Sequence, residues 1–194
     1  MQSELKSVIV IGGAGALGRS VVKTFKNMSP AWNVLSIDLV ENQEANENII
    51  LQKNFDKSTI VNINNTIKNN FDCIINVAGG WRGETLKNEE IVIVHDIMHK
   101  QNVASSVLAA YLAKKYLNKN GLLVLTGAAA VKDNYGSNML AYQLAKNSVH
   151  YLTEILAKNP QELPENAKII TLLPYKINRF LLFVFNEKRF LRLF

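Results

Sequence analysis

Hydrophobic positions along this chain fall into short apolar runs separated by amphipathic stretches. The β-branched run Val8–Ile11 stops at a glycine pair, and apolar residues then recur at helical spacing across Leu17–Phe25. This pattern predicts a strand, a turn and a helix. Further runs that predict strands are Trp32–Leu39, Ile49–Leu51, Phe71–Val77, Leu122–Leu125 and Lys168–Leu173.

Predicted helices alternate with these strands. Helical spacing of apolar residues occurs in Ser58–Asn69, in the long segment Glu89–Leu117 and in Ala141–Ala157, which ends just before Pro160. Several strand runs are apolar throughout, which is typical of a parallel sheet covered on both faces. The pattern predicts a doubly wound α/β domain, the Rossmann fold, with its ligand site at the carboxyl ends of the strands.

Composition fits one globular domain. The 194 residues are 48% hydrophobic and 20% charged, which excludes the collagen-like, disordered and disulfide-scaffold classes. Charge-free stretches are shorter than the roughly 18 to 20 apolar residues that span a bilayer, so we expect no membrane segment. The single cysteine, Cys73, indicates a reducing environment, and we expect a cytoplasmic protein.

The net charge of +6 does not indicate nucleic-acid binding. Most of the excess lies from Lys176 onward, where five basic residues accompany one acid, and the preceding residues are nearly neutral. His95 and His99 stand one helical turn apart, but no third ligand has suitable spacing, so we expect no metal site. We interpret both of them, and His150, as surface histidines.

The first turn has the glycine spacing of a phosphate-binding loop. Gly12, Gly15 and Gly18 lie between a predicted strand and helix, where glycine lets the backbone approach a pyrophosphate. Ala16 and Leu17 begin the helix, whose N–H groups and positive dipole end favour phosphate. The alternative is a tight strand-to-helix turn without a ligand.

Asp38 ends the second predicted strand, about 20 residues beyond the last of these glycines. A carboxylate there can accept hydrogen bonds from the hydroxyls of an adenosine ribose, and it would repel a 2′-phosphate. We therefore expect NADH to bind better than NADPH. The alternative is an ordinary solvated acid at a strand end.

Tyr142 and Lys146 are four residues apart, on one face of a predicted helix. A lysine cation favours the phenolate, so we expect Lys146 to lower the pKa of Tyr142 toward the range useful for proton donation. The same ammonium could hold the nicotinamide ribose. The alternative is a solvated pair on a helix surface.

With these features and the segment Asn76–Gly79, the chain resembles the short-chain dehydrogenase/reductase family from residue 5 to about residue 174. The resemblance implies that Ala78 and Gly79 border the cofactor. It also implies that Asn102, on the long helix, relays protons through a water to Lys146. The alternative is that Asn102 is a polar residue facing a neighbouring helix.

The family serine about a dozen residues before the tyrosine is missing, and Thr126–Ala130 stands in its place. A ketone reductase uses that hydroxyl to polarise the carbonyl, so its absence argues against a simple alcohol or ketone enzyme. The segments Val40–Asn42 and Val77–Trp81 resemble the dihydropteridine reductase branch. A quinonoid ring is already a strong electrophile and needs less support for a developing charge.

This resemblance implies reduction of a quinonoid dihydropterin by NADH, which regenerates tetrahydrobiopterin. Tyr142 would donate the proton and Trp81 would form an aromatic wall for the pterin; alternatively, Trp81 packs over the sheet edge. The resemblance also implies a homodimer formed through Glu89–Leu117 and Ala141–Ala157. Other readings are a reductase of another quinonoid or carbonyl substrate, or an NAD-binding partner subunit without turnover.

The resemblance stops near Pro174, so we divide the chain into a reductase domain, 1–174, and a non-matching apolar and basic tail, 175–194. Relative to the family, the chain is shortened at this end. Only six residues separate Leu173 from Phe180, fewer than the roughly twelve that a parallel crossover needs. We therefore expect the tail, which includes the apolar segment Phe180–Phe185, to add an antiparallel edge or a short helix.

Overall fold

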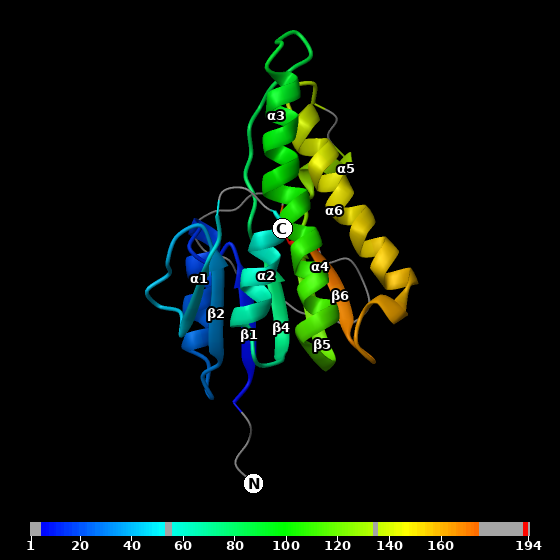
Figure 1. The fold of residues 1–194 in the computed structure, drawn as a ribbon. Coiled ribbons are helices and arrows are strands. Elements are labelled where there is room, and N and C mark those ends of the chain that lie inside the picture. The colour runs from blue at the N-terminus through cyan, green and yellow to red at the C-terminus, as the bar shows by residue number, and fades with distance from the viewer. Residues whose placement is uncertain (1–4, 53–55, 134–135, 175–191, 194) are drawn as a thin grey trace.

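A seven-stranded parallel sheet forms the centre of the computed structural model, which describes residues 5–52, 56–133, 136–174 and 192–193 (Figure 1). Every neighbouring pair of strands is parallel. The predicted doubly wound Rossmann fold is therefore confirmed. Across the sheet the strands are β3 (Glu47–Ile50), β2 (Asn33–Asp38), β1 (Ser7–Ile11), β4 (Phe71–Asn76), β5 (Leu117–Thr126), β6 (Lys168–Pro174) and β7 (Arg192–Leu193).

Helices cover both faces of the sheet. One apolar cluster joins the sheet to α1 (Ala16–Lys26), and another joins its opposite face to α2 (Lys57–Thr66), α4 (Ser105–Tyr116) and α6 (Leu140–Lys158). The other helical elements include α3 (Ile91–Met98), α5 (Ala130–Asp133) and the 3-10 turn η2 (Pro160–Glu162). In the part of the chain that the structure describes, no helix is long and apolar enough to cross a membrane.

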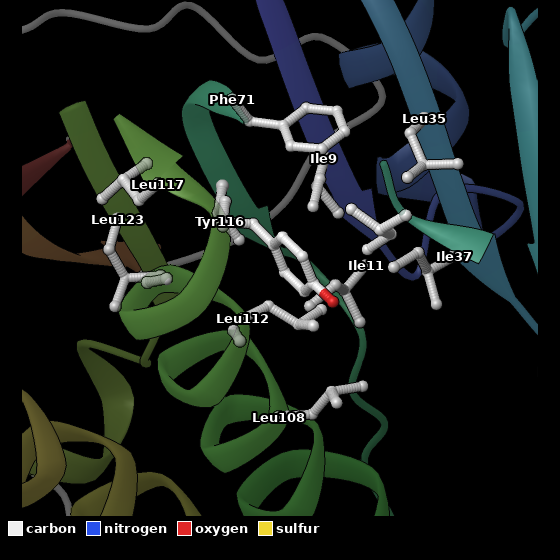
Figure 2. Close-up of a cluster of buried hydrophobic side chains, with 14 of the residues drawn as sticks. Ile9, Ile11, Leu35, Ile37, Phe71, Leu108, Leu112, Tyr116, Leu117 and Leu123 are labelled. Carbon is white, nitrogen blue, oxygen red and sulfur yellow. The ribbon is translucent and has the colours of Figure 1, made fainter. Parts of the chain in front are cut away.

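Strand β1 is apolar from Val8 to Ile11 because both of its faces are covered by helices. Ile9 and Ile11 point into the cluster beneath α2 and α4, whereas Val8 and Val10 point toward α1, and all four are almost completely buried. Figure 2 shows Ile9 and Ile11 packed near Tyr116 of α4. A strand with helices on both faces has no solvent side, so alternation disappears.

The segment predicted as one long helix is continuous but not uniform. It begins at Ile91 and contains a π-helical stretch, η1 (His99–Ala104), between α3 and α4. Within this stretch the Asn102 amide donates to the Met98 carbonyl at 2.9 Å, so a side chain occupies an acceptor of the helix ladder. π-Helical turns of this kind are frequent at functional sites.

Strand β5 begins five residues earlier than the apolar run Leu122–Leu125 predicts. Asn120 adopts a positive φ of 61°, and the chain continues in the sheet with a shift in register against β4. Asparagine tolerates this left-handed conformation better than most residues. The short helix α5 was not predicted.

The tail prediction is wrong where the structure describes the tail. Strand β7 pairs parallel with β6, through Leu173 with Arg192 and Pro174 with Leu193, whereas we expected an antiparallel edge or a short helix. The paired residues lie far beyond Phe180, so the six-residue spacing between Leu173 and Phe180 does not limit this pairing. The segment Phe180–Phe185 lies outside the described residues.

The packing of α2 against the sheet should contribute to the free energy of unfolding. Ile63 is fully buried against the sheet, whereas Val61 on the same helix is 48% exposed. Ile63→Ala should lower the free energy of unfolding by about 2 to 5 kcal/mol, because it leaves a cavity in a packed core. Val61→Ala should change it by less than about 0.5 kcal/mol. Urea unfolding measures both, and equal losses would contradict the packing described.

Candidate active site

A cavity of about 990 Å³ lies at the carboxyl ends of the central strands. In doubly wound folds ligands bind there, where the strand order reverses; here that point lies between β1 and β4. The cavity therefore occupies the expected place. Its walls include the following predicted site residues: Gly12, Gly15, Ala16, Leu17, Asp38, Ala78, Gly79, Trp81, Asn102, Tyr142 and Lys146.

The glycine turn is held so closely that side chains do not fit. Gly12 has a φ of +81°, and a Cβ there would lie 2.5 Å from the Ala78 backbone nitrogen. A Cβ on Gly18 would overlap the Gly12 carbonyl, so this residue supports the turn from inside the helix without lining the cavity. The packing of the turn itself therefore requires glycine at both positions.

The start of α1 is suited to an anion. Gly15 is the N-cap residue, no side chain caps this helix end, and its first turn contains no acid. The amide groups of Ala16 and Leu17 therefore remain for a ligand at the cavity wall, and the helix dipole favours negative charge. These residues fit the pyrophosphate of a nicotinamide dinucleotide.

Asp38 lies on the cavity wall at the end of β2, close to the glycine turn. One carboxylate oxygen accepts from the Ala14 amide at 2.8 Å, and the other accepts from the Leu39 amide at 2.6 Å. These bonds fix the carboxylate and leave it further acceptor capacity, because a carboxylate has about four acceptor positions. Asp38 is thus part of the turn structure as well as a candidate ribose ligand.

Asn42 supports the same turn and was not identified as a site residue from the sequence. Its side chain is 4% exposed and donates to the Gly13 carbonyl at 2.7 Å. Its own backbone is held by Asn48, which accepts from the Asn42 amide at 2.9 Å. Position in the sequence gives no signal of this role, because the chain contains many asparagines.

Asn102 lies beside the loop after β4. Its amide nitrogen donates to the Gly80 carbonyl at 3.1 Å, and its oxygen accepts from the Gly80 amide at 3.4 Å. A Cβ on Gly79 would lie 2.7 Å from this oxygen and 3.4 Å from Lys146 Nζ. Asn102 therefore fixes the loop after β4 by hydrogen bonds and lies near Lys146, with Gly79 between them. It does more than pack against a neighbouring helix.

Tyr142 and Lys146 both line the cavity from α6. Lys146 is 5% exposed, and its Nζ donates to the Thr126 carbonyl at 2.8 Å and lies 5.9 Å from the centroid of the Tyr142 ring. Burial lowers the pKa of Lys146 to about 8. The two residues are therefore not a solvated surface pair.

The expected effect of Lys146 on Tyr142 is wrong in this structure. Burial raises the pKa of Tyr142 above its usual value. Loss of hydration disfavours the phenolate, and the lysine, itself buried, donates to a backbone carbonyl and lies over the ring. Tyr142 is consequently a protonated acid at neutral pH.

The position of the missing serine carries no free hydroxyl. Ala128 and Ala130 line the cavity there, and the Thr126 hydroxyl donates to the Asn76 carbonyl at 2.8 Å. The threonine therefore does not replace the serine.

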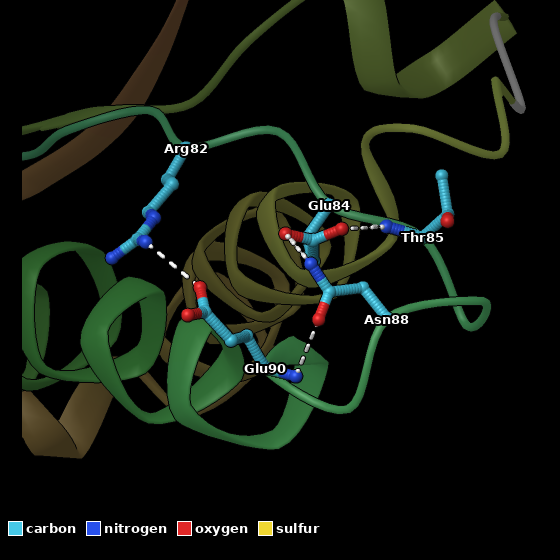
Figure 3. A network of polar contacts seen from close by, with 5 residues as sticks. All are labelled: Arg82, Glu84, Thr85, Asn88 and Glu90. Carbon is cyan, nitrogen blue, oxygen red and sulfur yellow. Dashed lines mark hydrogen bonds and ion pairs between the residues drawn. The ribbon is translucent and has the colours of Figure 1, made fainter.

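Trp81 lies on the cavity wall and is 61% exposed, so little of its ring is buried against the sheet. The loop that follows it is held by polar contacts, shown in Figure 3. Arg82 pairs with Glu90 at 3.2 Å, and Asn88 joins Glu84 to Glu90 by donating to Glu84 and accepting from the Glu90 amide. This exposed network gives the Trp81 loop a defined shape at the mouth of the cavity.

The histidine predictions are partly correct. His95 and His99 are exposed, with ring centroids 6.3 Å apart. His150 is not a surface histidine: it is half-buried, and its Nε2 accepts from the Ala128 amide at 3.2 Å. The surface prediction fails for His150 because α6 directs this position toward the loop after β5.

Similarity to known proteins agrees with this geometry. The dihydropteridine reductase of Dictyostelium discoideum is 36% identical over 177 residues, covering 89% of this chain and 74% of that protein. No protein-family model matches the chain.

Solved structures that share this fold include short-chain dehydrogenases. One from Francisella tularensis subsp. tularensis SCHU S4 superposes with a TM-score of 0.74 at 20% identity, covering 88% of this chain and 69% of that one. BdcA in complex with NADPH gives a TM-score of 0.71 at 17% identity, covering 87% and 70%. Sequence and fold together show that the chain is an NAD(P)H-dependent oxidoreductase that belongs to the dihydropteridine reductase family of short-chain dehydrogenases/reductases.

Proposed function

We propose that this chain reduces a quinonoid dihydropterin to its tetrahydro form with NADH, the reaction that regenerates tetrahydrobiopterin. The observation that carries the proposal is the cavity wall beside Tyr142, where alanines and a Thr126 hydroxyl bonded to Asn76 offer no group to polarise a ketone. The name of the Dictyostelium discoideum relative supports the same substrate. The single, buried Cys73 is compatible with the reducing, cytosolic setting that we expect.

The cofactor and the side chains of the site supply different parts of the reaction. The bound cofactor supplies a hydride, and Tyr142 supplies the proton that completes the two-electron reduction. A raised pKa keeps this phenol protonated near neutrality, as a general acid requires. Lys146, with its pKa of about 8, is largely cationic at pH 7 and can hold the nicotinamide ribose. Asn102, across Gly79 from Lys146, can hold a water that returns the proton.

The substrate enters at the cavity mouth beside Trp81. A pterin is flat and conjugated, and an indole offers a stacking surface for such a ring. The polar contacts of the loop from Arg82 to Glu90 hold this surface in place.

NADH is the cofactor that Asp38 favours. Its carboxylate faces the cavity and is fixed by two backbone amides, so it would meet a 2′-phosphate with like charge. Rejection of that phosphate is therefore electrostatic.

We also propose that the protein is a homodimer through the long helices. Exposed apolar side chains lie on each of them, including Val92 and Ile93 on α3, Val107 on α4 and Tyr151 on α6, which are 51 to 74% exposed. Large apolar side chains exposed on several helices are typical of surfaces that bind another protein chain. A second copy of the chain would cover them.

Tyr142→Phe tests the proton donor. It should lower kcat with NADH and quinonoid dihydropterin by about a hundredfold or more, because general acid catalysis is lost, while the Kd for NADH stays within about twofold. The double change Tyr142→Phe with Lys146→Ile should also weaken NADH binding. Stopped-flow NADH oxidation measures the rates. Tyr151→Phe is the matched control on the same helix and should keep the wild-type rate, and a wild-type rate in Tyr142→Phe would contradict the assignment.

Asp38→Asn tests cofactor choice. The amide oxygen can still accept from the Ala14 amide, so that support of the turn is kept, while the charge and the acceptor for the Leu39 amide are removed. NADPH should bind about tenfold more tightly relative to NADH than in the wild type, since like-charge repulsion is gone. Fluorescence titration gives both Kd values, with exposed Glu41→Ala as the control. An unchanged ratio would show that Asp38 does not select the cofactor.

Tyr151→Asp with Val107→Asp tests the dimer. Charges in an apolar interface cost too much desolvation to be buried, so the variant should sediment as a monomer. Val61→Asp, a similarly exposed position on α2, should leave the mass unchanged. Analytical ultracentrifugation decides; a monomeric wild type, or a double variant that stays dimeric, would overturn the proposed interface.

A further inference from the structure

The segment 126–130, which runs from the end of β5 through a short loop to the start of α5, forms the cavity wall next to the catalytic helix, and the backbone amides of the loop have fixed partners. The Gly127 amide donates to the Leu172 carbonyl at 2.8 Å, and the Ala129 amide donates to the Pro174 carbonyl at 3.1 Å. Between them, the Ala128 amide donates to His150 Nε2 at 3.2 Å. Two of these three acceptors are backbone carbonyls of β6, whereas the third can be protonated.

The histidine ring fits closely against this loop. A Cβ placed on Gly127 would overlap the His150 ring, so glycine is required where the ring packs. The hydrogen bond needs an unprotonated Nε2, because a backbone amide can only donate. His150 therefore holds the loop in its neutral form, with the proton on Nδ1.

Helix α6 forms hydrogen bonds with this segment at two points that are one helical turn apart. Lys146 Nζ donates to the Thr126 carbonyl at 2.8 Å, and His150 accepts from the Ala128 amide four residues further along the helix. The helix that carries Tyr142 and Lys146 thus also fixes the neighbouring wall of the cavity. Movement of the loop would change the width of the space beside Tyr142.

The charged groups that act on His150, among the described residues, are Lys146 and Glu154 on α6 and Lys132 on α5. Burial and the two lysines lower the pKa of His150 below its usual 6.5, and Glu154 opposes them. Protonation would place two N–H donors against each other at Ala128. The contact therefore forms above this pKa and is lost as the pH falls through it.

We propose that His150 is a positioning residue of the reductase, whose neutral imidazole holds the wall 126–130 at the distance from Tyr142 that the substrate requires and releases it on protonation. The inference rests on the proposed function only for its choice of substrate. His150 does not contact the reacting atoms. A change at His150 should therefore alter kcat/KM for the substrate and leave NADH binding unchanged.

His150→Leu and His150→Gln separate the roles. Leucine removes the acceptor, so kcat/KM for quinonoid dihydropterin should fall about tenfold while the Kd for NADH stays within about twofold. Glutamine places an oxygen near the position of Nε2 and does not titrate. His150→Gln should therefore keep most of the activity at neutral pH and lose the fall in kcat/KM that we expect of the wild type below pH 6.5. His95→Gln, an exposed histidine, is the control and should keep the wild-type pH profile.

Hydrogen exchange at the Ala128 amide provides a readout without substrate. Protection should be present in the wild type and in His150→Gln, and lost in His150→Leu. Equal losses of kcat/KM in the two variants, an acid limb retained in His150→Gln, or unchanged protection in His150→Leu would each overturn the inference. If the wild-type protein does not turn over quinonoid dihydropterin at all, the proposed function fails, and amide exchange still decides the role of His150.

Discussion

The close approach of two backbone turns, after β1 and after β4, is the constraint on which the site depends. The Ala78 amide donates to the Ile11 carbonyl at 3.0 Å, and the Gly12 amide donates to the Ile37 carbonyl at 2.8 Å, so the glycine turn is bonded to both neighbouring strands. A side chain at Gly12 would overlap Ala78. Only a glycine with positive φ satisfies this arrangement, and the cavity for the cofactor exists because the turns meet there without side chains.

Buried asparagines extend this constraint outward. Asn42 bonds to the Gly13 carbonyl, Asn76 donates to the Ser105 and Ser106 hydroxyls, and Asn102 bonds to both backbone groups of Gly80. Each amide can donate and accept, so one side chain satisfies backbone groups that a loop would otherwise leave unpaired. The loops of the site are therefore fixed by side chains of the chain itself.

Helix α6 connects this framework to the chemistry. Lys146 is almost fully buried, and a cation in such a place is costly unless it is paired or its pKa falls. Here its pKa falls to about 8 and its ammonium donates to the Thr126 carbonyl. The same desolvation raises the pKa of Tyr142. One environment therefore produces a phenol that keeps its proton and a lysine whose charge depends on pH near neutrality.

Local periodicity and residue spacing were enough to predict the strands, the main helices and the parallel sheet. The same local signals identified the glycine turn and the Tyr142/Lys146 pair. Tertiary structure alone decided that Asn42 and His150 hold site loops, that β7 is parallel, and that burial outweighs the lysine in setting the pKa of Tyr142. Desolvation and long-range hydrogen bonds depend on which segments meet in space, and no local pattern of residues encodes that meeting.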